Sequence, residues 1–197
     1  MLIMDSILST SLSVQGGGNA IQNSLETIDV RVRAIHVTLP HSIGSITGYH
    51  LFIVYTDKRG KQFICQGLPF DPATSKIAPD EILPSDPSGL LIKGQCIPLS
   101  SNNRDFIPDA PSITVLSGSD TRQAYNCFLK ETAIFNDAKI PYHMVTGTNS
   151  NSYARTILDK CNILAMKPTV AILTPGWDIS INLDDIPLKH TCPMFIY

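Results

Sequence analysis

Two runs of β-branched and aromatic residues, separated by one tight turn, restrict the fold of this chain more than any other feature. The runs cover residues 49–56 and 61–66, and residues 57–60, Asp-Lys-Arg-Gly, lie between them. An Asp…Gly turn between such runs is a strong signal for an antiparallel β-hairpin. Pairing across this turn brings the start of the first strand near the end of the second. We therefore expect His50 to lie close to Gln66.

A second strand pattern precedes the hairpin. Within residues 28–38, apolar side chains alternate with charged ones, and this period of two predicts a strand with one face toward solvent. Region 68–112 is dense in proline, which argues against long helices and indicates loops that cover one end of the sheet. Short strands are compatible with three apolar runs, at 90–92, 113–116 and 170–173.

Two segments carry the periodicity of amphipathic helices. The first spans about residues 120–137 and the second about 150–160. We therefore predict an α+β fold in which both helices pack against an antiparallel sheet of about five strands. Residues 1–25, which include a run of three glycines, are expected to be a flexible lead-in to a single domain that spans 26–197.

Charge and motif content exclude several function classes. A formal net charge of -2 offers no electrostatic basis for binding nucleic acid or an anionic membrane. No apolar run approaches the roughly 18 residues of a membrane-spanning helix. The sequence contains no phosphate-binding loop, no dinucleotide fingerprint and no helical histidine pair. We therefore expect neither a cofactor nor a metal.

The cysteines bear on the cellular location of the protein. They are odd in number, widely spaced and free of any C-x-x-C pair: Cys65, Cys96, Cys127, Cys161 and Cys192. This pattern predicts reduced thiols in a cytoplasmic protein. The N-terminus contains Asp5 and lacks the early Lys or Arg of a secretory signal. Export by a route that needs no cleaved signal is the alternative.

The stretch from Thr146 to Leu158 begins as a polar, glycine-containing turn and continues as an apolar-periodic helix. Such a turn places free backbone N–H groups at a helix N-terminus, where an anion or a developing oxyanion is stabilised. Ser150 is the candidate reactive residue in this turn. The alternative is that the row of Asn, Ser and Thr side chains only caps the helix.

His50 and Ser150 are far apart in sequence but together would form a minimal acyl-transfer site. A histidine can remove the proton of a hydroxyl while N–H groups at a helix end hold the oxyanion. Gln66 can orient the imidazole by accepting a hydrogen bond from its second nitrogen. The alternative is that His50 is a structural residue at the end of a strand. His36, His41, His143 and His190 are interpreted as structural.

Three segments carry a resemblance to a set of uncharacterised bacterial proteins. They are an H-L-x-I-V-x-T-D hairpin at 50–57, a G-x-N-S-N-S helix start at 147–152 and a P-G-W motif at 175–177. These segments and the residues around them cover about a third of the chain. The resemblance has specific motifs but implies little about activity.

The order of these parts also resembles circularly permuted papain-like enzymes, such as lecithin:retinol acyltransferase-like proteins and relatives of cell-wall amidases. The resemblance implies that His50 is the base, that Gln66 orients it, and that Ser150 occupies the position of the family's cysteine nucleophile. A serine hydroxyl is a far weaker nucleophile than a thiolate unless its base is well placed. Substrate-binding residues are expected around the same helix start: Gly67, Asn149, Asn151 and Ser152.

Three functions follow as hypotheses. The leading one is a papain-like hydrolase or acyltransferase acting on an amide or ester bond, in a peptide-like or small polar substrate or in the cell wall. The second is a non-catalytic module, or a toxin-like effector, of the same fold that binds a polar ligand through Asn149, Ser150 and Asn151. The third is a structural protein whose proline-rich region 68–112 contacts a protein partner.

Overall fold

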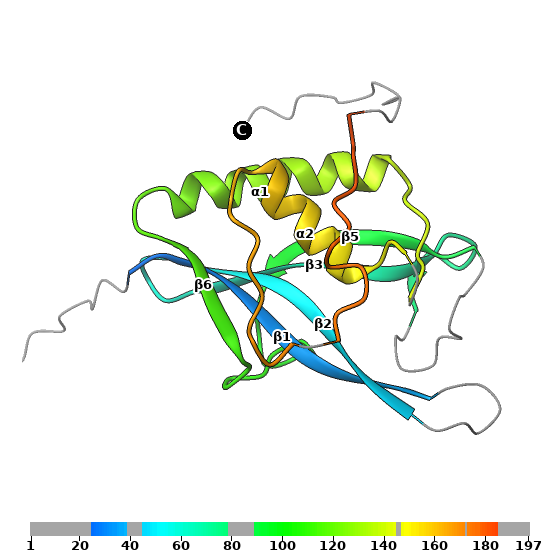
Figure 1. Ribbon diagram of the computed structural model, residues 1–197. Coiled ribbons are helices and arrows are strands. Elements are labelled where there is room, and N and C mark those ends of the chain that lie inside the picture. The colour runs from blue at the N-terminus through cyan, green and yellow to red at the C-terminus, as the bar shows by residue number, and fades with distance from the viewer. Residues whose placement is uncertain (1–24, 39–44, 79–88, 145–146, 172, 185–197) are drawn as a thin grey trace, which may run out of the picture.

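The fold is known from a computed structural model that describes residues 25–38, 45–78, 89–144, 147–171 and 173–184 (Figure 1). One antiparallel sheet is formed by six strands, and two helices lie on the same face of it. The strands are β1 (Thr27–Thr38), β2 (Ser45–Thr56), β3 (Gln62–Asp71), β4 (Lys76–Ile77), β5 (Leu91–Pro98) and β6 (Ser112–Ser117), and the helices are α1 (Thr121–Asp137) and α2 (Ser150–Lys160). The predicted α+β fold is therefore confirmed.

The sheet has the order β4-β3-β2-β1-β6, and β5 pairs with β3 along most of its length. The predicted hairpin is β2–β3, with Gly60 at a φ of 75° in its turn. β1 and β2 pair along their whole length, but β2 and β3 pair only from Ile53↔Cys65 to Thr56↔Gln62. Beyond Ile53 the two strands diverge, while β3 keeps its pairing with β5 along its other edge. This divergence leaves the edge of β2 open around His50.

The face of the sheet under the helices is apolar. Because successive side chains of a strand point to opposite faces, the strands present to the helices Ile28, Val30, Leu51, Ile53 and Tyr55, all of them buried. Helix α2 packs its Tyr153 ring against two strands at positions where both have a glycine. A Cβ on Gly67 would lie 2.7 Å from Tyr153 Cβ, and one on Gly94 would lie 2.5 Å from Tyr153 Cε2.

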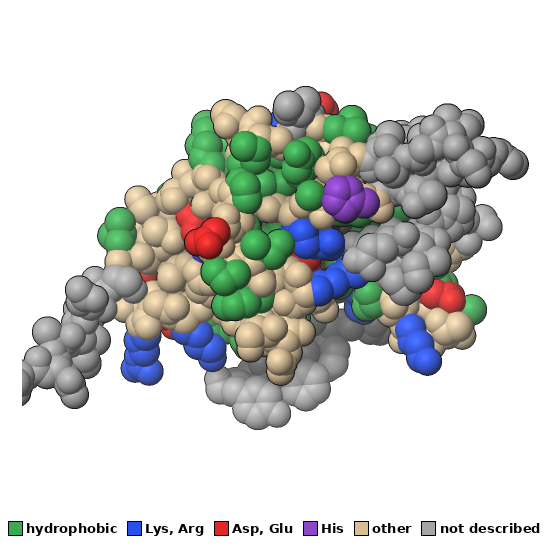
Figure 2. Space-filling model, turned by 90° about the horizontal axis from the view of Figure 1, so that it is seen from below, with side chains coloured by type: hydrophobic (Ala, Val, Ile, Leu, Met, Phe, Trp, Pro, Cys, Tyr) green, Lys and Arg blue, Asp and Glu red, His purple; other side chains and the backbone are tan. Residues whose placement is uncertain are grey.

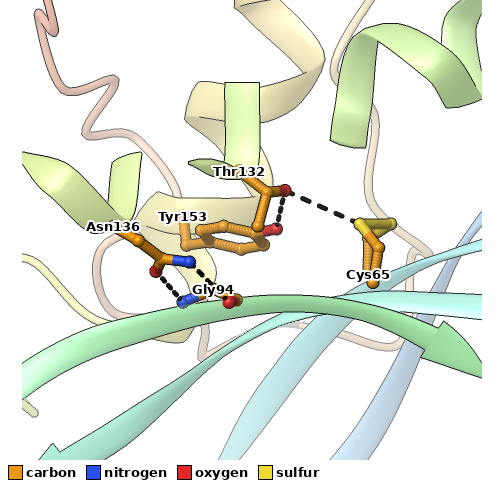
Figure 3. Close-up of a disulfide and its surroundings, with 6 residues drawn as sticks. Cys65, Gly94, Thr132, Asn136 and Tyr153 are labelled. Atoms are coloured by element: carbon orange, nitrogen blue, oxygen red, sulfur yellow. Dashed lines mark hydrogen bonds between the residues drawn. A yellow bond between two sulfur atoms is a disulfide. The ribbon is translucent and has the colours of Figure 1, made fainter. Parts of the chain in front are cut away.

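Side-chain hydrogen bonds join α1 to the same region (Figure 3). The Thr132 and Tyr153 hydroxyls are 2.7 Å apart, and Asn136 bonds both the N–H and the carbonyl of Gly94. Burial raises the pKa of Tyr153 well above its ordinary range. Tyr153 therefore stays a neutral hydrogen-bonding group between the helices and the sheet.

Two disulfides lie on the helix side of the sheet. Cys65 of β3 bonds Cys96 of β5, its direct cross-strand partner, and Cys127 of α1 bonds Cys161 at the end of α2. The prediction of free thiols is wrong for these four residues, and the fifth, Cys192, lies outside the described residues. The reason is that strand register and helix packing bring together cysteines that are 31 and 34 residues apart in sequence.

The opposite face of the sheet has a smaller apolar cluster, formed by Phe52, Val54 and Ile64. Leu99 packs against this cluster and begins the segment 99–111, which connects the strand beside β3 to the strand beside β1. The Leu99 N–H bonds the Gln62 carbonyl, and the Pro111 carbonyl accepts from the Val32 N–H. The segment therefore crosses this face, where charged side chains lie among apolar ones (Figure 2).

The structure departs from the sequence predictions in the irregular regions. The proline-rich stretch contains a full strand, β5, because Pro98 stands at its last position, where no further ladder bond is required. Residues 170, 171 and 173 form no strand, and the Leu173 carbonyl only accepts one bond from the Tyr49 N–H. Residues 1–24, most of the predicted lead-in, lie outside the described residues.

Candidate functional site

Helix α2 begins with a complete capping box. Asn149 is the N-cap, and its side-chain oxygen accepts a hydrogen bond of 2.9 Å from the Asn151 N–H. The Ser152 hydroxyl in turn accepts from the Asn149 N–H at 2.8 Å. The capping alternative raised by the sequence is therefore correct for Asn149 and Ser152. Both side chains are buried and satisfy the orphan donors of the helix end.

Asn151 fastens the start of α2 to the open edge of β2. Its Oδ1 accepts from the Leu51 N–H at 2.8 Å, and its Nδ2 donates to the Tyr49 and Pro175 carbonyls, each at 2.9 Å. The two β2 groups flank His50 and face the gap where β3 has diverged. Asn151 thus replaces the missing strand partner, and the start of α2 is held beside strand position 50.

The P-G-W motif packs against the same helix start. Gly176 has a φ of 80°, and a Cβ on it would lie 2.6 Å from Asn149 Oδ1, so only glycine fits there. Trp177 is buried in the core on the helix side. The hairpin, the helix start and the P-G-W turn therefore meet at one junction, although they are separated by about 100 and about 25 residues.

Ser150 differs from its neighbours in this junction. The residue is 6% exposed, none of the described hydrogen bonds uses its hydroxyl, and this oxygen is not among the fully buried polar atoms without a partner. Ser150 is the first residue of α2, where the helix dipole favours negative charge. The side chains of Asn149, Asn151 and Ser152 form hydrogen bonds that hold the junction together. No described hydrogen bond of the junction uses the Ser150 side chain.

His50 and Gln66 form a buried hydrogen-bonded pair. His50 Nε2 lies 3.2 Å from Gln66 Oε1, and each residue is 1% exposed. The predicted proximity of these residues is confirmed, and both are buried rather than exposed at the surface. Because an amide oxygen only accepts, Nε2 must carry the proton in this contact. The neutral ring then has its lone pair on Nδ1.

Strand alternation places the His50 ring on the face opposite the helices. His50 stacks on Phe52, with ring centroids 5.7 Å apart, and Phe52 belongs to the apolar cluster of that face. Ser150 begins a helix that packs on the other face, and no described hydrogen bond joins the two residues. Both residues lie beside the gap between the diverging strands β2 and β3. Gly67, the remaining candidate, is buried against Tyr153 and Ile92.

The sequence did not reveal two charged residues near this pair. Arg33 is the cross-strand partner of His50 in β1, and its Nε donates to Asp105 Oδ1 at 2.7 Å. Asp105 lies in the segment 99–111 and its side chain is 1% exposed. The alternation of charged and apolar residues in β1 is the sequence signal that could have pointed to Arg33. No local pattern in the sequence connects β1 with residue 105.

Two of the remaining histidines are described, and one of them, His143, lies at the turn before α2, where its N–H bonds the Thr148 carbonyl. His36 bonds the Thr47 hydroxyl at an exposed position, and His41 and His190 lie outside the described residues. Within the described ranges, no three His, Cys, Asp or Glu side chains are grouped so that they could hold a metal ion. In that same part of the chain, neither helix has the length and apolarity needed to cross a membrane.

Comparison with known protein families, with curated proteins and with solved structures finds no match for this chain.

Proposed function

We propose that the protein is a hydrolase or acyltransferase that acts on an amide or ester bond, with Ser150 as nucleophile, His50 as base and Gln66 as the residue that orients the base. The observation that carries the proposal is the Ser150 hydroxyl, which is nearly buried at a helix N-terminus and has no internal partner among the described residues. A hydroxyl in this position is available to a substrate carbonyl. The N–H groups of Asn151 and Ser152 already donate to the Asn149 side chain, so among the described groups of this turn the Ser150 N–H is the one left to face the oxyanion.

The tautomer of His50 supports the same roles. Because Nε2–H donates to Gln66, the proposed base atom is Nδ1, which takes the serine proton as the bond to the substrate carbon forms. Gln66 fixes the ring without adding a negative charge, so it orients the imidazolium without stabilising it as a carboxylate would. Turnover requires that the His50 ring reach the Ser150 hydroxyl through the gap between β2 and β3 once a substrate is bound.

The test uses three variants and an acyl-transfer probe that labels serine and cysteine hydrolases. Ser150→Ala and His50→Ala should each abolish labelling, because nucleophile and base act as one unit. Ser150→Cys should retain or raise labelling, because a thiol ionises more readily than a hydroxyl. Ser150→Ala should change the free energy of unfolding by no more than about 2 kcal/mol, the upper range for a residue at a helix end. Absence of labelling in folded wild type and Ser150→Cys would rule out the enzyme.

The second candidate is a non-catalytic module that binds a small polar or peptide-like ligand. The observation that favours it is the absence of a described hydrogen bond between His50 and Ser150, together with the burial of both. In this case Ser150→Ala would weaken binding by about 1–3 kcal/mol, the value of a lost hydrogen bond, and no reaction would exist to lose. Calorimetric titration of wild type and Ser150→Ala with small peptide-like amides separates the two functions.

We also propose that the protein works in an oxidising compartment and not in the cytoplasm. Two disulfides within one small domain support this location, because cytoplasmic thiols are kept reduced. An exported, effector-like protein fits this location. Alkylation of thiols in intact cells, followed by mass spectrometry, should find Cys65, Cys96, Cys127 and Cys161 protected. Alkylation of these cysteines without reductant would contradict the oxidising compartment and support a cytoplasmic location.

A further inference from the structure

An apolar pocket of about 430 Å³ lies at the end of α2 that is remote from Ser150. Residues of β6, of the first turns of α1 and of the turn after α2 enclose it, and the Cys127–Cys161 disulfide forms part of its wall. Leu164 also lines it and is 73% exposed, the highest value among the large apolar side chains of the described residues. Binding pockets in proteins have volumes of about 300–1,000 Å³ and mostly apolar linings, so this pocket has the properties of a binding site.

The last described residues lead the chain toward this pocket. The Ile181 N–H donates to Thr156 Oγ1 at 2.8 Å, and three residues later Asp184 Oδ2 accepts from Lys160 Nζ at 2.6 Å. Thr156 and Lys160 are about one helical turn apart, so this segment runs along α2 toward its C-terminal end. Leu183, between the two contacts, is buried in the core. Because Lys160 also lines the pocket, the described chain ends at the edge of the pocket.

The next five residues have a sequence that suits an apolar pocket. Residues 185–189 are Asp-Ile-Pro-Leu-Lys and lie outside the described residues. The proline at 187 restricts Ile186 to extended backbone, and it has no N–H of its own that would require a partner. In an extended segment, side chains two residues apart point to the same side. Ile186 and Leu188 can therefore enter the pocket together.

The length of this segment also fits the pocket. The pocket extends along α1 from Cys127 to Asp120, seven residues earlier, which corresponds to about 10 Å of helix. The Cα atoms of Cys127 and Cys161 are 5.9 Å apart, and Cys161 directly follows Lys160. Five extended residues span roughly 16 Å. Residues 185–189 are therefore long enough to reach from Lys160 across the pocket to Asp120.

The charges at the rim indicate the direction in which the segment lies. Asp120 is the acidic residue of the lining, and Lys160, the basic one, is already bonded to Asp184. Among the described contacts, the Asp120 carboxylate accepts only from the Ser119 hydroxyl, at 3.2 Å. Lys189, at the end of the segment, can therefore approach this carboxylate as an ion pair.

We propose that the pocket is the docking site of residues 185–189 of the same chain, with Ile186 and Leu188 inside it and Lys189 facing Asp120. The docked segment covers the Cys127–Cys161 disulfide. Thiol–disulfide exchange requires access of a thiolate to a sulfur of the disulfide, so the segment protects this bond from reduction. The inference is independent of the proposed function, because Ser150 lies at the other end of α2.

The first experiment measures how fast dithiothreitol reduces each disulfide in the full chain, by alkylation of the released thiols and mass spectrometry. Leu188→Asp should speed the reduction of Cys127–Cys161 several-fold, because a carboxylate does not enter an apolar pocket. Cys65–Cys96 is the internal reference, since it joins β3 to β5 outside the pocket and its rate should not change. General unfolding would speed both reductions, so the ratio of the two rates identifies the local effect. Met194→Asp is the matched control, since it places the same charge beyond residues 185–189, and it should keep the wild-type ratio.

The second experiment locates the segment by NMR. Methyl groups of Ile186 and Leu188 should show nuclear Overhauser contacts to methyl groups of the pocket, such as those of Val115 and Leu164. Lys189→Glu should weaken these contacts, and the double variant Asp120→Lys/Lys189→Glu should restore them, because it reverses both charges of the pair.

Two results would overturn the proposal. One is a Leu188→Asp variant in which the two disulfides are reduced at the wild-type ratio. The other is a wild type in which Ile186 and Leu188 show no contact to the pocket methyl groups. Contacts that appear only between differently labelled chains in a mixed sample would assign the pocket to the segment of a second copy, and would overturn docking within one chain.

Discussion

The two faces of the sheet are built from the same strands but bury different chemistry. On the helix face, apolar side chains of β1 and β2 pack against α1 and α2, and glycines admit the Tyr153 ring. On the opposite face, alternate residues of the same strands bury Arg33, His50 and the carboxylate of Asp105 around a small apolar cluster. The first face satisfies its polar groups, whereas the second leaves two buried polar atoms, Arg31 Nε and Asp105 Oδ2, without a partner among the described residues.

This difference separates stability from function. Apolar burial and satisfied hydrogen bonds lower the free energy of the folded state, and the helix face has both. Buried charges are weak evidence for stability, because desolvation offsets their attraction. We therefore expect substitutions on the helix face to cost stability in proportion to the packing and hydrogen bonds they remove, whereas on the opposite face the cost depends on whether a buried charge is left alone.

The largest effect is expected from the disulfides, both of which lie on the helix side. Replacing Cys127 and Cys161 by alanine should lower the free energy of unfolding by roughly 3–4 kcal/mol, because a link between residues 34 apart no longer restricts the unfolded chain. Denaturant titration with and without reductant measures the loss. Finding Cys127 and Cys161 as two titratable thiols in unreduced, denatured wild type would contradict it.

The junction between the two faces should be the next most sensitive place. Asn151→Ala leaves the Leu51 N–H and the Tyr49 and Pro175 carbonyls without their partner, which should cost about 3 kcal/mol. Asn126→Ala is the control, since Asn126 is exposed on α1 and should tolerate alanine. Equal stability of the two variants in urea would show that the hydrogen bonds of Asn151 do not stabilise the fold.

The close approach of Tyr153 predicts a smaller cost. Gly67→Ala should destabilise by about 2 kcal/mol, because the added methyl meets the rigid Cβ of Tyr153 at 2.7 Å and Ile92 at 2.9 Å. Gly48→Ala is the matched strand control, because the atom nearest to its added Cβ is the Leu173 carbonyl oxygen at 3.9 Å. Thermal unfolding of both should show a lowered midpoint for Gly67→Ala alone.

Tyr153→Phe should cost about 1 kcal/mol at neutral pH through the lost bond to Thr132. Burial raises the pKa of Tyr153 above its ordinary value of 10.0, so the unfolded chain releases this proton at a lower pH than the folded protein. The stability that Tyr153 contributes is therefore complete below pH 10 and declines above it, by up to about 1.4 kcal/mol per pH unit. The gap between wild type and Tyr153→Phe should narrow above pH 10 in urea titrations. A constant gap would contradict the burial effect.

The smallest effect is expected on the opposite face. Arg31→Met should leave the free energy of unfolding within about 0.5 kcal/mol of wild type, because the contact it removes, with Asp29, is long at 3.6 Å and Asp29 keeps its bond to Thr114. Arg33→Met is the comparison, since it leaves the Asp105 carboxylate buried alone and should cost about 3 kcal/mol. A large loss of stability in Arg31→Met would contradict the expected difference between the two faces.

The sequence alone determined the parts of this protein that depend on neighbours in the chain. The hairpin around Gly60 follows from turn chemistry, and the strand over 28–38 follows from its alternation. Helices α1 and α2 were predicted nearly to their bounds, because periodicity and capping are local. The proximity of His50 and Gln66 could be predicted for the same reason, since a short turn fixes which residues of its two strands meet.

Only the tertiary structure decided which groups meet across long separations. Cys65 pairs with Cys96 because β5 lies along the other edge of β3 in the register that places these two residues opposite each other, and no spacing in the sequence indicates that register. The divergence of β3 from β2 beyond Ile53 opens the β2 edge that Asn151 occupies, and so decides that this side chain is structural. The ion pair of Arg33 with Asp105 arises because a proline-rich segment crosses beneath the sheet, a path set by packing of the whole domain and not by any local rule.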